Sequence, residues 1–476
     1  MQDKVAGLSA AATLTQAGLS VRVLEARGRL GGRVLTVEEG DGVLEEGAQW
    51  LHGGCHGNSM FNLAAKHHLL GDTVKLLGHG WGKDNMPGYF YTSSGRVIKE
   101  AVSDMAWDIF EEINNECQDY FSNIALETID TSVSLKQFYW ELVKDKMENL
   151  GPLKPSEEED LELCLSSLST ALAEYICDDL EKPSLALYGT CRELPGGDVI
   201  VPQGLHTVID ALADTLPPEV VKLGEKVINI EWGLDKLIIT TETSMYFCDH
   251  VVVTVPLGVL KKSHLSLFTP SLGEDKIRAI KNMGEGSICK IFLAWDEPWW
   301  MGGYGVVQLA WSRTEVETAE LPQHWYRYIL YFLPVEGQHN VLLFWVVGQA
   351  AAVVDRLPDQ EIVDTIGWLL RKFTSDSTLP SPNRIIRHCW TTDPFTMGGY
   401  SYPSTKSQLS DYSHLSEPLP SSGQPKLLLA GEHTHQHYWS FLHGARLSGI
   451  EQAHKIIAWR QQTSTTLQKE TVWLSN

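Results

Sequence analysis

The sequence predicts an α/β fold in which a Rossmann-like nucleotide-binding domain is assembled from discontinuous segments and carries an inserted, mixed α+β domain. Three observations predict this fold. The chain has 476 residues, which is too many for one ordinary hydrophobic core. Its first 35 residues have the pattern of the helix–strand half of a βαβ unit. Strand and helix patterns of the same kind return twice, after long stretches of different character.

The nucleotide-binding domain is expected to comprise residues 1–80, 190–264 and 389–460. It opens with an Ala- and Leu-rich helix that ends at a glycine and leads into a β-branched strand. Parallel strands connected by such helices are typical of doubly wound folds. The expected elements are a helix at 6–17, a strand at 21–24, a helix after Pro202, strands at 220–232, 237–243 and 250–255, an apolar strand at 427–430 and a helix at 444–460.

The inserted domain is expected at residues 81–189 and 265–388, with 461–476 as a C-terminal tail. Its second part predicts strands at 328–333 and 341–347. The apolar run 341–354 is too short for a membrane span, and we interpret it as a buried strand followed by the start of a helix. In its first part, large apolar residues recur at helical spacing, at Trp107, Phe110, Ile113 and Cys117.

Composition limits the class of partner. The net charge of −22 disfavours nucleic acid and anionic membrane surfaces and suits cationic small molecules. The eight cysteines include no C-x-x-C pair, so neither a disulfide framework nor a metal site is expected. No secretory signal pattern stands at the N-terminus, and the final Leu-Ser-Asn is not a peroxisomal address, so a cytoplasmic location is expected.

The segment that follows the first strand has the composition of a dinucleotide site. Glu25 stands at the strand end, where dinucleotide-binding folds place an acid that binds a ribose diol. A loop with a flexible backbone and three guanidinium groups follows, and this combination suits a pyrophosphate. The loop residues are Arg27, Arg29, Gly31, Gly32 and Arg33.

Five runs then carry a resemblance: Ala6-Gly-Leu-Ser-Ala-Ala, Val23-Leu-Glu-Ala-Arg-Gly-Arg-Leu-Gly-Gly-Arg, Gly47-Ala-Gln-Trp-Leu-His-Gly, Val251-Val-Val-Thr-Val-Pro-Leu-Gly and Leu429-Ala-Gly-Glu-His-Thr. They are similar to the signature segments of the flavin-dependent amine oxidases. Together with His443-Gly-Ala-Arg-Leu-Ser-Gly, the run 47–53 most resembles the polyamine oxidase branch. The resemblance extends from residue 6 to about residue 460 and implies an FAD cofactor.

The start of the chain departs from this family pattern. The family begins with a buried strand and a G-x-G-x-x-G turn, whereas here only the third glycine remains, as Gly7, and Gln2 and Lys4 stand in place of the others. The expected first strand is missing from this sequence. Two explanations remain open: a truncated form of a functional enzyme, or a protein with impaired flavin binding. In either case we expect a loss of stability, because neighbouring strands lose a partner.

The resemblance assigns catalytic roles to several residues. Lys290, in an apolar strand, matches the lysine that holds a water against flavin N5, whereas the plain alternative is a lysine on an edge strand. His52 matches a position that faces the substrate, where it could orient an amine or transfer a proton. Tyr400 and Phe441 match an aromatic pair that flanks the amine, with Trp439 an alternative to Phe441.

The resemblance also implies cofactor contacts. Gly399 stands where monoamine oxidases carry the cysteine that links to the flavin, so non-covalent FAD is expected. The helix that opens near Leu442 would direct its positive end at the flavin N1 and O2 edge. The remaining assignments are Gly7 and Gly32 in phosphate-loop positions, Glu25 to the adenosine ribose, Arg33 to the pyrophosphate, Val227 to the adenine, Trp50 and Trp390 to the isoalloxazine, and Gly431 and Glu432 to the ribityl or pyrophosphate region.

These residues predict an oxidase that uses O₂ to convert spermine, spermidine or their acetylated forms to an aminoaldehyde, a shorter amine and hydrogen peroxide. A monomer is expected. Histone lysine demethylases are the nearest rival enzymes, but this sequence has no sustained heptads for their coiled coil. L-amino-acid oxidases rank lower because they need an arginine for the substrate carboxylate. A non-catalytic protein that cannot hold FAD is the rival from another class.

Overall fold

The computed structural model describes residues 3–40, 42–74, 86–123 and 129–473, with side chains from residue 5 to residue 463. The expected domain boundary at residues 80 and 81 lies outside these residues. The helices are α1 (Asp3–Gln16), α2 (Ser59–Lys66), α3 (Glu100–Asp119), α4 (Leu135–Asn149), α5 (Pro155–Ile176), α6 (Leu185–Tyr188), α7 (His206–Ala213), α8 (Leu257–Leu267), α9 (Glu274–Asn282), α10 (Arg313–Glu317), α11 (Gly348–Val354), α12 (Asp359–Thr374), α13 (Ser410–Ser416) and α14 (Leu442–Trp473). Short 3₁₀ helices are η1 (Tyr120–Asn123), η3 (Trp299–Gly302), η4 (Trp325–Tyr328) and η5 (Glu432–Thr434).

The strands are short except in one sheet. They are β1 (Val23–Glu25), β2 (Thr36–Glu39), β3 (Gly42–Glu45), β4 (Leu51–His52), β5 (Thr73–Val74), β6 (Gly88–Thr92), β7 (Asp198–Val199), β8 (Val221–Leu223), β9 (Val227–Glu231), β10 (Leu237–Thr241), β11 (Met245–Cys248), β12 (Val251–Val253), β13 (Phe268–Thr269), β14 (Gly284–Glu285), β15 (Ile288–Ala294), β16 (Val306–Ala310), β17 (Tyr331–Pro334), β18 (Val341–Val347), β19 (Arg384–Cys389), β20 (Ser401–Tyr402) and β21 (Leu427–Leu429).

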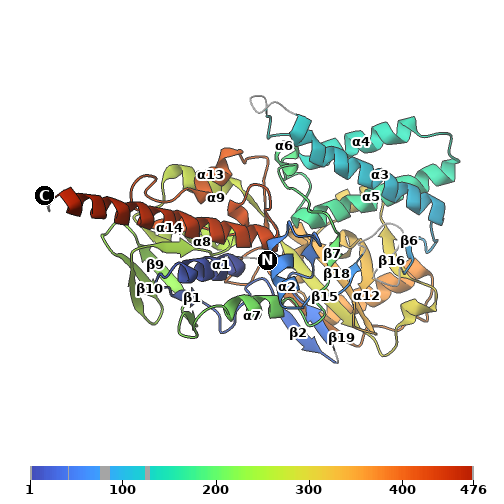
Figure 1. Ribbon diagram of the computed structural model, residues 1–476. Coiled ribbons are helices and arrows are strands. Elements are labelled where there is room, and N and C mark those ends of the chain that lie inside the picture. Colours follow the sequence, from blue (N-terminus) through green and yellow to red (C-terminus); the bar gives the residue numbers. More distant parts are fainter. Residues whose placement is uncertain (1–2, 41, 75–85, 124–128, 474–476) are drawn as a thin grey trace.

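The chain forms two lobes (Figure 1). In the first lobe α14 runs beside α1 and extends beyond it toward the C-terminus. Parallel pairing joins β1 to β8 and β12 to β21, which is the pairing expected of a Rossmann-like unit. The fold is therefore a mixed α/β fold. Its division into the predicted segments stays a prediction, and β13, just inside the expected second domain, pairs with β9 of the first.

Two glycines let α1 pack closely. A Cβ on Gly449 of α14 would lie 2.1 Å from the carbonyl oxygen of Ala6 in α1. A Cβ on Gly7 would lie 3.0 Å from the Thr254 hydroxyl, beyond the end of β12. Close packing of helix on strand is the role of the third glycine in dinucleotide-binding turns, and the Gly7 contact agrees with that role.

The second lobe is built on a six-stranded sheet in the order β19-β15-β18-β17-β16-β6. All seven residues of β15 are buried, because strands flank it and α11 packs against it. The run 341–354 forms β18 followed by α11, as predicted. Helices α3 to α6 lie at one end of this lobe (Figure 1), and α3 buries the four residues predicted from helical spacing.

Several boundaries differ from the sequence predictions. The strand expected at 220–232 is divided into β8 and β9, because Gly224 between them has φ of +73°. The strand expected at 328–333 starts only at Tyr331, after the 3₁₀ helix η4. The last helix begins at Leu442 and continues to Trp473, through most of the expected tail. No helix within the described ranges is long and apolar enough to span a bilayer.

One disulfide departs from the expectation for the cysteines. Cys289 and Cys389 are bonded, and they stand directly opposite each other in the antiparallel pair of β15 and β19. The sequence does not reveal this bond because 100 residues separate the two cysteines and only the strand pairing brings them together.

Candidate active site

A cavity of about 660 Å³ lies where segments of the two lobes meet, and the residues predicted to be catalytic line it. Its walls come from β4, α5, β15, β17, β18, the 188–198 segment and the 439–443 segment. Lys290, His52, Tyr400, Phe441 and Trp439 all line it. Residues distant in sequence by up to several hundred positions therefore share one site, which is the arrangement that a combined cofactor and substrate pocket requires.

Lys290 is buried on β15, with 3% of its surface exposed. Its Nζ donates to the carbonyl of Gly47 at 3.2 Å and lies 5.8 Å from the ring centre of Trp345. Burial lowers the pKa of this ammonium below its usual value, and the nearby carboxylates of Glu45 and Glu46 oppose that shift only in part. The structure therefore excludes the alternative of a solvent-facing lysine on an edge strand.

His52 faces the cavity from β4, which pairs with β7 so that His52 stands opposite Asp198. The imidazole Nδ1 lies 2.7 Å from Asp198 Oδ1. Burial lowers the pKa of His52, but the charge and hydrogen bond of Asp198 outweigh it, so the net shift is upward. The ring of Phe441 lies 5.3 Å away in an edge-on arrangement, which completes one wall.

The aromatic residues are held by hydrogen bonds as well as by packing. The Tyr400 hydroxyl donates to the backbone carbonyl of Glu174 at 2.5 Å. The Trp439 Nε1 donates to the Thr190 hydroxyl at 3.2 Å. Both Tyr400 and Phe441 line the cavity, as their assignment as an aromatic pair requires. Their contact with a substrate amine stays a prediction.

Three acids of the cavity wall were not predicted from the sequence: Glu174, Glu193 and Asp198. Glu174 accepts a hydrogen bond from the Tyr331 hydroxyl at 2.5 Å, and burial raises its pKa to about 8 despite that bond. Glu193 accepts from the Gln118 amide at 2.8 Å in an exposed position. A signal for Glu174 exists in the sequence, because it follows the apolar run 171–173 near the end of α5, where an acid needs a partner.

Glu432 connects two parts of the site rather than facing open space. Its carboxylate is fully buried and accepts from the Ser401 hydroxyl at 2.6 Å, the Ser440 backbone N–H at 2.8 Å and the Arg33 guanidinium at 3.3 Å. Ser440 has φ of +65°, an unfavourable conformation for serine that these bonds hold in place. Ser401 follows Tyr400 and Ser440 precedes Phe441, so this carboxylate fixes the two segments that carry the aromatic pair.

The arginines of the predicted phosphate loop have protein partners. Arg33 is buried and also donates to the Gly399 carbonyl at 2.6 Å. Arg29 donates to the Gly32 carbonyl at 2.9 Å, within its own loop, and Arg27 forms an ion pair with Asp393. These bonds order the loop, and a contact with a pyrophosphate stays a prediction.

The predicted adenosine contacts lie near one another. Glu25 ends β1 and accepts at 2.6 Å from the backbone N–H of Arg27. Its carbonyl accepts from the N–H of Glu225, two residues before Val227. The Glu25 carboxylate and the backbone of Val227 are thus brought to one edge of the first lobe, and their contact with an adenosine stays a prediction.

Of the residues assigned to the isoalloxazine, Trp50 lines the cavity and packs 6.3 Å from Trp345. Trp390 is buried behind it, where its Nε1 donates to the Glu46 carbonyl at 3.1 Å. Leu442 begins α14, and the N–H of Gly431 donates to the Ser448 hydroxyl of that helix. The start of α14 therefore points its positive end at the cavity.

The cavity suits a flat aromatic cofactor. His443, one residue into α14, lines the cavity, and its Nε2 is buried with no partner among the described residues. Burial lowers its pKa to about 3, so its imidazole is neutral. Aromatic walls, a buried lysine and a helix N-terminus form a donor set that matches a planar ring with a polar edge.

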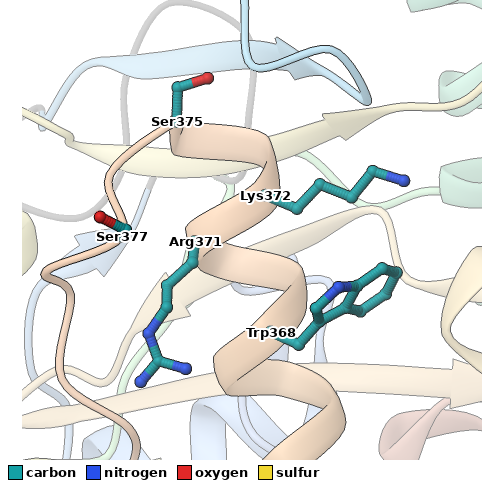
Figure 2. Close-up of a pocket in the computed structure, with 5 residues that line it drawn as sticks. All are labelled: Trp368, Arg371, Lys372, Ser375 and Ser377. Atoms are coloured by element: carbon teal, nitrogen blue, oxygen red, sulfur yellow. The ribbon is translucent and has the colours of Figure 1, made fainter.

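A second, open pocket of about 430 Å³ lies on the surface at the end of α12. Figure 2 shows Lys372 and Trp368 extending from one side of the helix and Arg371 from the other, with Ser377 in the loop that follows the helix. Arg371 already donates to the carbonyl of Leu379 and the hydroxyl of Ser381. Because its cations diverge and none of the predicted site residues lies there, this pocket is not the candidate site.

Comparison with known proteins identifies the family. Residues 5–457 match the family described as "Flavin containing amine oxidoreductase". The chain belongs to this family. It is 33% identical to "Peroxisomal N(1)-acetyl-spermine/spermidine oxidase" of Bos taurus, over 95% of this chain and 93% of that protein. It is 26% identical to "Probable polyamine oxidase 5" of Arabidopsis thaliana, over 95% of this chain and 96% of that protein.

Membership of the flavin-containing amine oxidoreductases implies FAD as the cofactor, and the polyamine oxidase branch is the part of the family that the chain most resembles. "Lysine-specific histone demethylase 2" of Homo sapiens is 27% identical over 95% of this chain but over only 52% of its own length. The rival demethylase interpretation therefore has less support than the polyamine oxidase interpretation.

Proposed function

We propose that this chain is an FAD-dependent oxidase that attacks a secondary amine of spermine, spermidine or their acetylated forms. The products are an aminoaldehyde, a shorter amine and hydrogen peroxide. The observation that carries the proposal is the composition of the cavity, whose wall combines three acids and several aromatic rings with one buried lysine. Acids and aromatic faces are the groups that bind a chain of ammonium ions.

The flavin supplies the hydride acceptor when it is bound. The aromatic walls exclude water and hold an apolar methylene chain, while the carboxylates of Glu193 and Asp198 attract its ammonium groups. Glu174, whose pKa burial raises to about 8, joins them as an anion only when the pH approaches that value. His52, held by Asp198, has a ring nitrogen left for the substrate amine. Lys290, held by the Gly47 carbonyl, retains hydrogens with which to hold a water molecule beside the reacting carbon.

The reacting amine must be neutral, so activity is expected to rise with pH. A flat profile from about pH 6 to 9 with spermine would count against hydride removal beside a neutral nitrogen. The proposal also retains a non-covalent FAD, a monomer and a cytoplasmic location, although the bovine relative is named as peroxisomal.

The decisive experiment is an absorption spectrum of the purified protein followed by peroxide release with spermine, N-acetylspermine and spermidine in parallel. A flavin spectrum together with turnover of at least one polyamine supports the proposal. A folded, colourless protein would instead favour the non-catalytic alternative. Turnover of a methylated lysine peptide without turnover of polyamines would favour the demethylase.

Lys290→Met tests the lysine within this function. Methionine has a similar length but no hydrogens for a water molecule, so turnover is expected to fall by about 10-fold or more while the protein still binds flavin. Unchanged kinetics would remove Lys290 from the mechanism. Lys262→Met, on the exposed surface of α8, is a control of the same chemical change away from the cavity.

A further inference from the structure

The disulfide Cys289–Cys389 lies beside the active site without entering it. The two residues are directly opposite in the antiparallel pair of β15 and β19, and their Cα atoms are 4.2 Å apart. Such close Cα pairs occur at the non-hydrogen-bonded positions of antiparallel strands, where facing side chains are near enough to bond. The geometry of the strands thus accommodates the bond without moving the backbone.

Each cysteine stands one residue before a residue assigned to the site. Cys289 precedes Lys290, whose Nζ donates to the Gly47 carbonyl at 3.2 Å. Cys389 precedes Trp390, whose Nε1 donates to the Glu46 carbonyl at 3.1 Å. The residues that follow the two bonded cysteines therefore hold two consecutive carbonyls of a single segment.

That segment leads directly into the cavity wall. After Glu46 and Gly47, the chain continues through Trp50 to His52, which both line the cavity. The spacing between Lys290 and Trp390 thus helps to place this segment, together with the backbone bonds that Glu46 and Gly47 donate to the Leu35 carbonyl. A shift of one strand against the other would move the two donors relative to the two carbonyls.

The disulfide itself faces away from the cavity. Neighbouring residues of a strand point to opposite faces, so Cys289 and Lys290 lie on opposite sides of the sheet. Cys289 is fully buried and Cys389 is 8% exposed, and both belong to the apolar core beneath α11 and α12. Any effect on the reaction must therefore act through the position of Lys290 and Trp390.

We propose that the Cys289–Cys389 disulfide is a positioning crosslink, which fixes Lys290 and Trp390 at the spacing of the Glu46 and Gly47 carbonyls and so places the cavity wall from Trp50 to His52. Its kinetic consequence rests on the proposed function. The three acids of the cavity wall, Glu174 on α5 and Glu193 and Asp198 in the 188–198 segment, lie on elements other than the two crosslinked strands. The crosslink therefore acts on the chemical step more than on substrate binding.

The test compares Cys289→Ala/Cys389→Ala with Cys117→Ala/Cys164→Ala, a matched pair of buried free cysteines in α3 and α5. Misplacement of reacting groups by about 1 Å costs up to about 100-fold, so kcat is expected to fall by about 10-fold or more. The KM for spermine is expected to change by less than about 3-fold, because the acids keep their places. The absorption bands of the bound flavin should shift in the first variant and not in the second.

Peptide mass spectrometry without reduction gives a first, activity-independent result, since native protein should yield a linked peptide containing Cys289 and Cys389. Two free thiols in that experiment would overturn the proposal, and so would a first variant whose kcat and flavin bands match the native protein. If that variant does not fold, reduction and alkylation of the native protein replace it, with the same expected losses. A native protein that binds flavin but oxidises no polyamine would refute the proposed function, while the spectral comparison would still decide the crosslink.

Discussion

Glu174→Gln is expected to stabilise the protein in a pH-dependent way. Burial in the cavity wall raises the pKa of Glu174 from 4.5 to about 8. Because the folded value lies above the unfolded value, the contribution of this group to stability is fully present below about pH 4.5 and is lost as the pH rises toward 8. Glutamine does not titrate, and its amide oxygen still accepts the hydrogen bond from Tyr331.

The size of the effect follows from that shift. At about 1.4 kcal/mol per pH unit, a rise from 4.5 to about 8 corresponds to an upper limit of about 5 kcal/mol. Water in the cavity reduces this value. We therefore expect the free energy of unfolding of Glu174→Gln to be higher than that of the native protein by about 2 to 4 kcal/mol at pH 8.5, and to equal it near pH 5.

Urea unfolding followed by tryptophan fluorescence at pH 5, 7 and 8.5 measures this difference. Glu162→Gln, on the exposed side of the same helix α5, is the matched control and should show no trend with pH. A stability difference for Glu174→Gln that stays constant over this pH range would refute the reasoning, because it would show that the carboxyl does not titrate in the folded protein above its unfolded value.

Three further variants test separate features. Glu193→Gln removes a charge at the exposed part of the cavity wall, so the KM for spermine should rise by about 3- to 10-fold at nearly constant kcat in steady-state assays; a lower kcat alone would contradict this role. Asp198→Asn removes the carboxylate that raises the pKa of His52, so the acidic limb of the kcat/KM profile should move to lower pH. An acidic limb that stays in place would show that the titration of His52 does not cause it. Gly258→Ala would place a Cβ 2.4 Å from the Met397 carbonyl, and urea unfolding should show a loss of about 1 to 3 kcal/mol, whereas native stability would mean that the loop before Tyr400 can shift freely.

Regular patterns in the sequence predicted the parts of the fold that depend on local periodicity. The helical spacing from Trp107 to Cys117, the strand at 341–347 and the buried strand that carries Lys290 all follow from which residues must be covered by apolar neighbours. The wrong boundaries, at Gly224 and around Tyr328, occur where backbone conformation rather than apolarity decides the element.

Only some residues of the candidate site were predicted from the sequence. His52 lies in a run that resembles a family motif, Lys290 was matched to a family lysine from its apolar strand, and the structure places both in one cavity. Glu174, Glu193 and Asp198 lie outside those runs, and only the meeting of α5 with the 188–198 segment brings them together. No periodicity or spacing specifies such a meeting, because it depends on tertiary packing. The Cys289–Cys389 bond was missed for the same reason.

Glu432 was assigned to the cofactor, but the structure shows that it also holds other protein segments in place. The family resemblance assigns this acid to the cofactor, yet in the structure its carboxylate is occupied by Ser401, Ser440 and Arg33. A fully buried carboxyl group is costly to leave without its hydrogen-bond donors, so loss of one of them destabilises the fold by about 1 to 3 kcal/mol. Its removal would therefore release the segments that carry Tyr400 and Phe441, even in the absence of flavin. The acid at this position has to shape the aromatic wall before it can serve any cofactor, so loss of activity in a Glu432 variant would not by itself demonstrate a contact with FAD.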